Sequence, residues 1–198
     1  MESAHSGSPS GPAETPVVAF QGEPGAFSEL AIKRAWPHGA TPYPCETFDR
    51  ALDELMNGTV DFAMIPVENA IVGPVVTALN ALDARAGRVR HVMELRVPVH
   101  LYLMALPGAT LDTLRTVRSH PVALAQCRYY LAQHPWLVPE AHYDTAGAAH
   151  DVSQGGDLTI GAVASEAAAT RYRLSILARN VEDVSANSTR FVVVERTT

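Results

Sequence analysis

The sequence predicts an α/β protein of two lobes with a cleft between them. From Val17 onward, short apolar runs alternate with stretches of helical apolar spacing, which indicates helices packed on a mostly parallel sheet. Two extended runs, 89–98 and 99–108, then follow one another with no helical pattern between them, so we expect them to cross into a second lobe. An apolar, β-branched run at 190–196 is expected to return to the first lobe.

These crossings define the expected boundaries of the two lobes. Residues 16–97 and 176–198 would form lobe 1, and residues 98–175 would form lobe 2. Residues 1–15 are rich in Ser, Gly and Pro and are expected to form a disordered tail. That segment lacks the basic start and apolar core of a signal peptide, and no run is apolar enough to span a bilayer. We therefore expect a cytoplasmic protein without a membrane partner.

Helix start and stop signals support each expected element of the first half. Pro37 ends the first helix, Thr47 and Gly58 suit the N-cap and C-cap of the second, and Pro74 suits the first turn of the third. The expected strands are 17–20, 41–45 and 61–67, and the expected helices are 26–36, 47–58 and 73–87.

The second half repeats the alternation of strand and helix. Pro121 suits the start of one helix, and either Asp144 or Thr145 suits the N-cap of the next. The expected strands are 114–119, 138–143 and 158–163, and the expected helices are 121–134, 145–155 and 165–172. The runs 174–181 and 190–196 close the chain as strands.

Composition and charge exclude several classes of function. The 198 residues carry 15 basic and 21 acidic side chains, a net charge of −6, so no basic surplus exists to bind nucleic acid. An anionic small molecule remains possible, because helix N-termini and a few arginines can hold a carboxylate. The two cysteines, Cys45 and Cys127, form no CxxC pair and no disulfide framework, which is typical of a reducing compartment.

Several catalytic chemistries also lack their residues. The sequence contains no HExxH motif, no Cys/His cluster and no GxSxG elbow. Its only lysine, Lys33, lies in the middle of an expected helix, which does not suit a Schiff base. We therefore expect no metal and no cofactor. An enzyme built from these residues would act through neutral donors and positioning.

Five segments lie at strand ends, where open α/β sheets bind ligands. They are GEPGAFSE (22–29), PVENAIVGP (66–74), SHPVALAQC (119–127), DTAGAAHDV (144–152) and NSTRF (187–191). The first is read more simply as a turn into a helix, and Asn69 in the second as an Asx-turn or cap. His120 is interpreted as a turn histidine and Cys127 as a packing residue.

The NSTRF segment brings a hydroxyl, a guanidinium and an aromatic ring together at the edge of an apolar strand. An isolated arginine at such an edge is usually a solvated charge. Here we hypothesise that Thr189 donates a hydrogen bond to a departing oxygen. Arg190 would pair with a ligand carboxylate, and Phe191 would wall a ring.

Taken together, these segments resemble the prephenate dehydratase family over about 17–195. The resembling stretches, in order, are FQGEPGAFSELA, IPVENAIVG, LPVHLYLMALPG, SHPVALAQC, DTAGAA and NSTRF. The resemblance implies a two-lobed catalytic domain similar to type II periplasmic binding proteins, with the active site between the lobes. It also implies conversion of prephenate to phenylpyruvate, carbon dioxide and water, with no cofactor, in a protein that can form a homodimer.

The resemblance assigns roles to single residues. Thr189 matches the threonine most closely tied to catalysis. The residues that match substrate-binding positions are Asn69, Ser119, Gln126 and Thr145, to which the residue-level hypothesis adds Arg190 and Phe191. This chain departs from the family pattern at Ala70, where a serine or threonine is common, and at Val122, where glutamine is common.

Three alternatives remain open at this point. The chain resembles arogenate dehydratases too, which perform the same chemistry on the aminated substrate. A binding module of the same fold would capture an aromatic acid without reacting it. Many relatives carry a C-terminal ACT domain that binds phenylalanine, whereas this chain stops at Thr198. Either it is truncated or it lacks that control, and the third alternative is a catalytically inert fragment that a missing partner domain completes.

Overall fold

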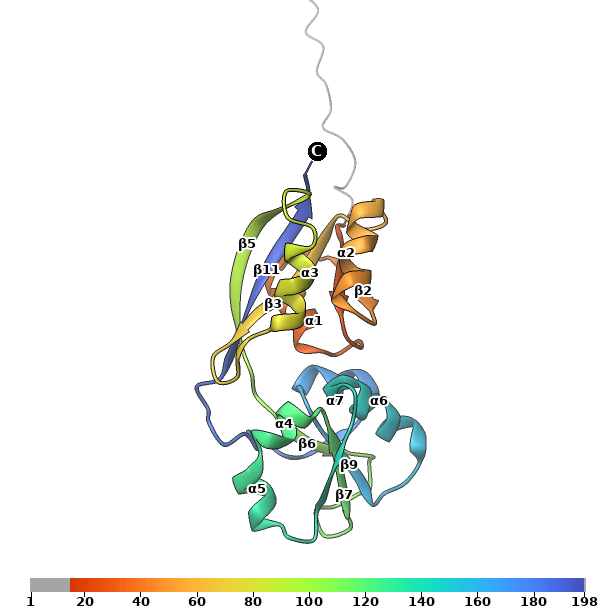
Figure 1. Cartoon of the computed structure of the whole chain (residues 1–198). Coiled ribbons are helices and arrows are strands. Elements are labelled where there is room, and N and C mark those ends of the chain that lie inside the picture. Colours follow the sequence, from red (N-terminus) through yellow and green to blue (C-terminus); the bar gives the residue numbers. More distant parts are fainter. Residues whose placement is uncertain (1–14, 198) are drawn as a thin grey trace, which may run out of the picture.

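Two α/β lobes joined by two crossings of the chain make up the computed structural model, which describes residues 15–197 (Figure 1). The expected disordered tail lies outside the described residues except for Thr15. Across the described part of the chain, no helix is long and apolar enough to cross a membrane.

The first lobe is a six-stranded sheet in the order β2-β1-β3-β11-β5, with β4 beside β3. β1 runs parallel to β2 and β3, while β11 runs antiparallel to β3 and β5. Its strands are β1 (Val17–Gln21), β2 (Thr41–Cys45), β3 (Phe62–Asn69), β4 (Gly73–Pro74), β5 (Val89–Pro98) and β11 (Ser188–Arg196), and its helices are α1 (Phe27–Ala35), α2 (Phe48–Asn57) and α3 (Val76–Asp83).

Local signals explain both ends of α2. The Thr47 hydroxyl caps α2 by accepting from the Arg50 N–H at 3.0 Å, and Gly58 ends α2 in the left-handed region at φ 77°. Both caps confirm the prediction. Pro74, in contrast, does not enter the third helix. It pairs with Glu68 in β4, and α3 begins only at Val76.

The second lobe is a five-stranded sheet in the order β10-β6-β9-β7-β8. Its strands are β6 (Tyr102–Ala105), β7 (Thr116–Ser119), β8 (Val138–Ala141), β9 (Ile160–Ala164) and β10 (Ser175–Ala178), and its helices are α4 (Pro121–Ala125), α5 (Arg128–Gln133), α6 (Thr145–Gly155) and α7 (Glu166–Tyr172). β7 is parallel to β8 and β9, whereas β6 is antiparallel to β9 and β10. Both sheets are thus mixed rather than mostly parallel.

Two further expectations need correction. The helix expected at 121–134 is two short helices that meet at Gln126 and Cys127. The return to lobe 1 also comes later than residue 176, because β10 pairs with β6 in the second sheet and Val181 packs in the second-lobe core.

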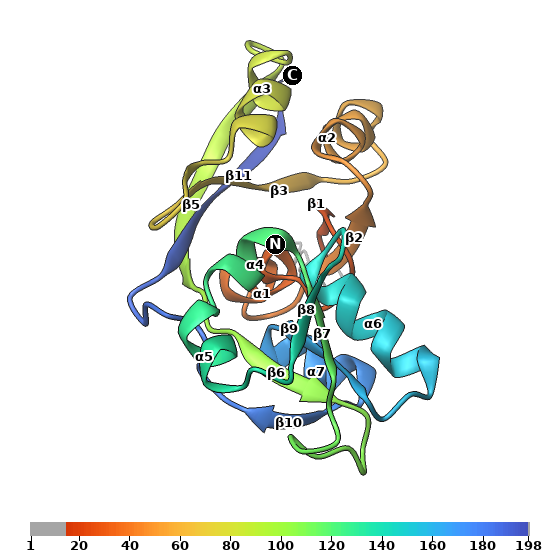
Figure 2. The same cartoon turned by 60° about the horizontal axis from the view of Figure 1, so that its bottom comes forward.

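The two lobes share a hydrophobic core around α1, which lies at their junction in Figure 2. This core joins Phe20 and Ile32 of the first lobe to Ala146 and Ala164 of the second. The loop between β1 and α1 also docks on α7. The Ser165 hydroxyl donates to the Gly25 carbonyl at 2.7 Å, and the Tyr172 hydroxyl donates to the Pro24 carbonyl at 2.6 Å.

Gly25 makes the closest of these approaches. Its φ is +93°, and a Cβ built there would lie 2.9 Å from the Ala168 Cα. Glycine is the residue that satisfies both the backbone angle and the contact. The GEPG turn therefore sets how closely the lobes meet, and so positions the cleft beside it.

Candidate active site

An open cavity of about 650 Å³ lies between the lobes, and a smaller one of about 180 Å³ adjoins it. Both are lined by Thr189, Asn69, Phe27, His120, Asp144 and Thr145. These residues come from the ends of strands and the starts of helices, where open α/β sheets bind ligands. The two cavities together form the candidate active site.

A hydrogen bond from Asn69 fixes the hydroxyl of Thr189. The side-chain oxygen of Asn69, Oδ1, accepts from the N–H groups of Ile71 and Val72, both at 3.1 Å. The side-chain nitrogen, Nδ2, is therefore the atom that is left to donate. That nitrogen donates to the Thr189 Oγ1 at 3.0 Å. Because the Thr189 oxygen accepts there, its own hydrogen is free to donate into the cavity. The Asx-turn expected at Asn69 is present, and it serves this arrangement.

The alternation of side chains along β11 separates the NSTRF residues. Thr189 and Phe191 line the larger cavity. Arg190, expected in the cleft, points to the opposite face. There its guanidinium donates to Glu68 at 3.0 Å and to Glu94 at 3.2 Å. Successive residues of a strand face opposite sides of the sheet, so Arg190 cannot share the cavity with its neighbours.

Arg190→Gln is therefore expected to leave turnover within a few-fold of the wild type, because the change removes exposed ion pairs on the far face of the sheet. Steady-state kinetics measures this directly. A collapse of turnover comparable to that of a Thr189 variant would show that the guanidinium reaches the substrate after all.

Of the other expected site residues, two line a cavity and one does not. Thr145 lines both cavities, and Gln126 lines the smaller one. The Gln126 side-chain oxygen accepts from Asn187 at 3.0 Å, which leaves its amide N–H₂ available. Ser119 is fully buried and donates to the Val163 carbonyl at 2.6 Å, so it ties β7 to β9 and lines neither cavity.

The sequence interpretation missed part of the site. Phe27 and Ser28 form the first turn of α1 and line the larger cavity, and their backbone N–H groups have no partner within the helix. His120 lines both cavities, and it is also the N-cap of α4, where its Nδ1 accepts from the Val122 N–H at 3.2 Å, which confirms its interpretation as a turn residue. The GEPG turn was the available signal, because it places the positive end of α1 directly after a strand.

Acidic side chains outnumber basic ones in the larger cavity. Among the described residues, the titratable side chains that line it are Glu46, Asp49, Asp144 and His120, and none of them is a lysine or an arginine. An anionic ligand must therefore be held mainly by hydroxyl, amide and backbone N–H donors.

Asp144 is the carboxyl group that the fold perturbs toward its neutral form. It caps α6 by accepting from the Gly147 N–H at 2.8 Å. Burial raises the pKa of Asp144 and the nearby Glu23 carboxylate adds to this, while the bonds from α6 and the charge of His120 oppose the shift. Since the folded state binds this proton more tightly than the unfolded state, stability from Asp144 is greatest at low pH. It falls as pH rises through the ordinary carboxyl range.

Asp144→Asn should therefore raise the melting temperature at pH 7, since asparagine keeps the cap without the cost of a buried charge. The gain should shrink toward pH 3, because protonation of the wild-type carboxyl removes the buried charge. Asp151, on the same helix, is the control, because hydrogen bonds from His150 and His142 lower its pKa. Asp151→Asn should lower stability at pH 7. Calorimetry at both pH values measures the two signs, and equal signs would contradict the assignment.

The fold and these cavities define a two-lobed α/β protein with a cavity between its lobes. The chain belongs to the prephenate dehydratase family, whose model, described as "Prephenate dehydratase", matches residues 18–198.

Two relatives with similar sequences carry dehydratase names. The chain is 41% identical over 180 residues to a bifunctional N-acyl-homoserine lactone acylase/prephenate dehydratase of Komagataeibacter europaeus, covering 91% of this chain and 63% of that protein. It is 38% identical over 179 residues to arogenate dehydratase/prephenate dehydratase 1 of Arabidopsis thaliana, covering 90% of this chain and 45% of that protein. The chain thus spans less than two thirds of these relatives.

A solved structure agrees with the fold. The prephenate dehydratase of Arthrobacter aurescens in complex with L-Phe is 30% identical to this chain and superposes with a TM-score of 0.84. The match covers 92% of this chain and 61% of that one. The α/β class and the two-lobed arrangement are thereby confirmed.

Proposed function

We propose that this chain catalyses the decarboxylating dehydration of prephenate to phenylpyruvate, a step toward phenylalanine. The observation that carries the proposal is the Thr189 hydroxyl, which Asn69 holds at 3.0 Å with its hydrogen free to donate into the cavity. Family membership supports the reaction class.

The chemistry suits a site made of neutral donors. Prephenate is a non-aromatic ring that bears a carboxylate and, across the ring, a hydroxyl. Loss of both yields a benzene ring, so aromatisation supplies the driving force and no base is needed. The protein has to hold two carboxylates, help the hydroxide to leave, and keep water from the carboxylate that departs as carbon dioxide.

Each task has a candidate group in the cavity. Backbone N–H groups at the starts of α1 and α6, with Ser28 and Thr145, would hold the carboxylates. Phe27 and Phe191 would wall the ring and exclude water. Thr189 would donate to the leaving oxygen as negative charge develops on it.

The proton balance points to one further group. Prephenate carries two negative charges, and its products are a monoanion, carbon dioxide and hydroxide, so one proton must be supplied to form water. Threonine is too weak an acid to be the net source and would act as a donor or relay. Asp144 lines the same cavity with a raised pKa. We propose that its carboxyl relays this proton from solvent to the cavity, so Asp144→Asn should lose turnover while it gains stability.

The decisive experiment incubates the purified chain with prephenate and, in parallel, with arogenate. Phenylpyruvate formed faster from prephenate supports the proposal. Faster formation of phenylalanine from arogenate would instead make the chain an arogenate dehydratase, the name that relatives in petunia carry. Binding of either compound without product would leave only the binding module.

We also infer a cytoplasmic homodimer. Both cysteines are buried and unpaired, which suits a reducing compartment. β5 is an edge strand of the first-lobe sheet and exposes Val92 and Met93, and an exposed edge strand offers backbone groups with which a second copy can pair. Sedimentation of wild type and Val92→Lys tests the dimer, because the lysine should shift a dimer toward monomer. A wild type that sediments only as monomer would refute it.

A further inference from the structure

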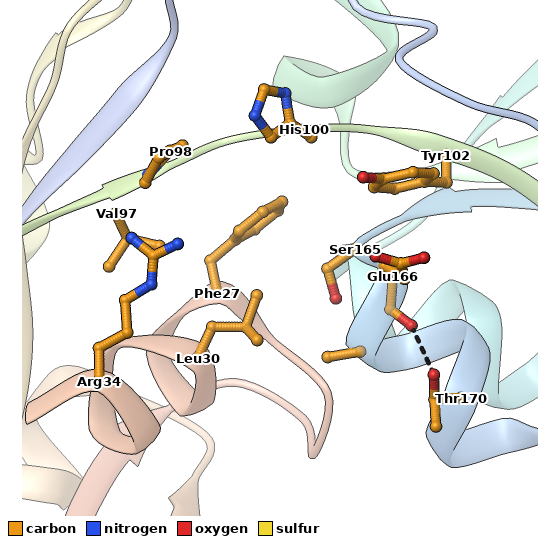
Figure 3. A pocket seen from close by; sticks show the side chains of 11 residues that line it. Phe27, Leu30, Arg34, Val97, Pro98, His100, Tyr102, Ser165, Glu166 and Thr170 are labelled. Atoms are coloured by element: carbon orange, nitrogen blue, oxygen red, sulfur yellow. Dashed lines mark hydrogen bonds between the residues drawn. The ribbon is translucent and has the colours of Figure 1, made fainter. Parts of the chain in front are cut away.

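A third cavity, of about 440 Å³, lies between the lobes behind Phe27. Figure 3 shows its three walls: Leu30 and Arg34 on α1, Pro98 and His100 on the first crossing, and Thr170 on α7. Phe27 is the one residue that it shares with the two cavities of the candidate active site. We call it the hinge cavity.

The first crossing separates the hinge cavity from the active site. From Pro98 to Tyr102 the side chains alternate: Pro98, His100 and Tyr102 line the hinge cavity, whereas Val99 and Leu101 line the smaller active-site cavity. An extended chain presents alternate side chains to opposite sides, so one thin segment contacts both spaces. Its Val97 is also the register partner of Thr189 in the sheet.

Among the described residues, one of the charged side chains that line the hinge cavity is a cation with no partner. Glu166 is already paired with Arg179 at 2.7 Å. His100 donates to Glu182 at 2.9 Å, and that carboxylate is 1% exposed and also accepts from the Leu101 N–H. Within residues 15–197, the side chain of Arg34 makes no hydrogen bond or ion pair, and Figure 3 shows it directed into the cavity.

Apolar groups form the rest of the surface. Leu30, Phe27, Val97, Pro98 and Tyr102 surround the space beside Arg34. A guanidinium without a partner can bind a carboxylate. The apolar walls beside it suit a ligand whose other end is a small apolar body.

We propose that the hinge cavity binds a small apolar monocarboxylate, with its carboxylate on Arg34 and its body against Leu30 and Pro98. A bound ligand touches both lobes and the crossing, so it holds one interlobe angle. Turnover in a two-lobed enzyme requires opening and closing, so occupancy slows turnover. This second consequence rests on the proposed function, whereas the binding itself does not.

Hexanoate is the probe for binding, because it has no ring and no second carboxylate and so matches the active-site cavity poorly. Methyl NMR should show shifts at Leu30 and Ala167, with a Kd of about 1 mM. Arg34→Gln should weaken binding about tenfold or more, since it removes a charge-assisted bond. The matched control is Arg88→Gln, the same change at an exposed lobe 1 residue outside the cavity. It should leave the Kd unchanged.

Three results would overturn the site. They are no binding up to about 10 mM, shifts confined to the Thr145 methyl of the active-site cavity, and equal Kd values for Arg34→Gln and wild type. Thr170→Trp, at the exposed rim, should block binding by filling the mouth without disturbing the core.

The kinetic arm measures prephenate turnover at saturating hexanoate. A fall in kcat that Arg34→Gln abolishes supports the coupling. An unchanged kcat with hexanoate bound would refute the coupling to turnover, while the binding site itself would stand. Absence of dehydratase activity would refute the proposed function, while the NMR result would still stand.

Discussion

Replacing Thr189 by alanine is expected to lower turnover by about 10²–10³-fold while substrate affinity changes little. One donor aimed at developing charge in a site closed to water contributes about 3–4 kcal/mol to the transition state. Alanine keeps the backbone position in the strand but removes the hydroxyl that Asn69 orients. Steady-state kinetics with prephenate, together with the Kd of a substrate analogue, separates the two effects.

Two variants sharpen this test. Thr189→Ser keeps the hydroxyl and should retain most of the turnover. Asn69→Ala removes the bond that orients the hydroxyl and should fall between serine and alanine at position 189. If Thr189→Ala turned over prephenate at the wild-type rate, the catalytic role of this hydroxyl would be refuted.

The second large effect is expected at Gly25, where alanine should destabilise the protein by about 2–5 kcal/mol. Part of the cost comes from a positive φ of 93°, and part from a Cβ that would lie 2.9 Å from the Ala168 Cα. The neighbouring backbone would have to shift, and it belongs to the other lobe. Urea unfolding measures the free energy of unfolding.

Gly108→Ala is the matched control for that variant. Gly108 has a φ of 95°, but a Cβ there would meet nothing within 4 Å. It should therefore show the backbone cost alone, about 1–2 kcal/mol. The difference between the two variants isolates the contact between lobes. Equal losses would show that the contact adds nothing to stability.

Periodicity and end signals in the sequence were enough to predict most elements, but not how they pair. α2, with Thr47 and Gly58 at its ends, is specified by residues within a few positions of one another. The direction in which two strands pair is not specified locally, because a run of β-branched residues has the same pattern in parallel and in antiparallel sheets. The antiparallel pairing of β10 with β6 therefore moved the lobe boundary beyond residue 176.

The break between α4 and α5 has a cause far away in the sequence. Asp183 accepts from the N–H groups of Arg128 and Tyr129, at 3.2 Å and 2.9 Å, and so caps α5. The apolar spacing of 121–134 continues through this point, and nothing local announces a cap from 55 residues downstream. Tertiary contact here overrides helical periodicity.

The site was predictable as a set of segments rather than as a set of side chains. Thr189, Phe191, Asn69, Gln126 and Thr145 do line the cavities. Arg190 was grouped with Thr189 because they are adjacent, although the alternation of a strand assigns neighbours to opposite faces. Ser119 ends a strand, yet its hydroxyl is used inside the second sheet.

The hydrophobic core that spans both lobes determines how cooperatively the molecule unfolds. Phe20 and Ile32 pack in one cluster with Ala146 and Ala164, so neither half can lose its packing without exposing apolar surface of the other. The calorimetric and van't Hoff enthalpies should then agree in a single melting transition. Residues 98–187 expressed alone should be only partly folded, and their slowest amides should lose the protection from exchange that they have in the whole chain.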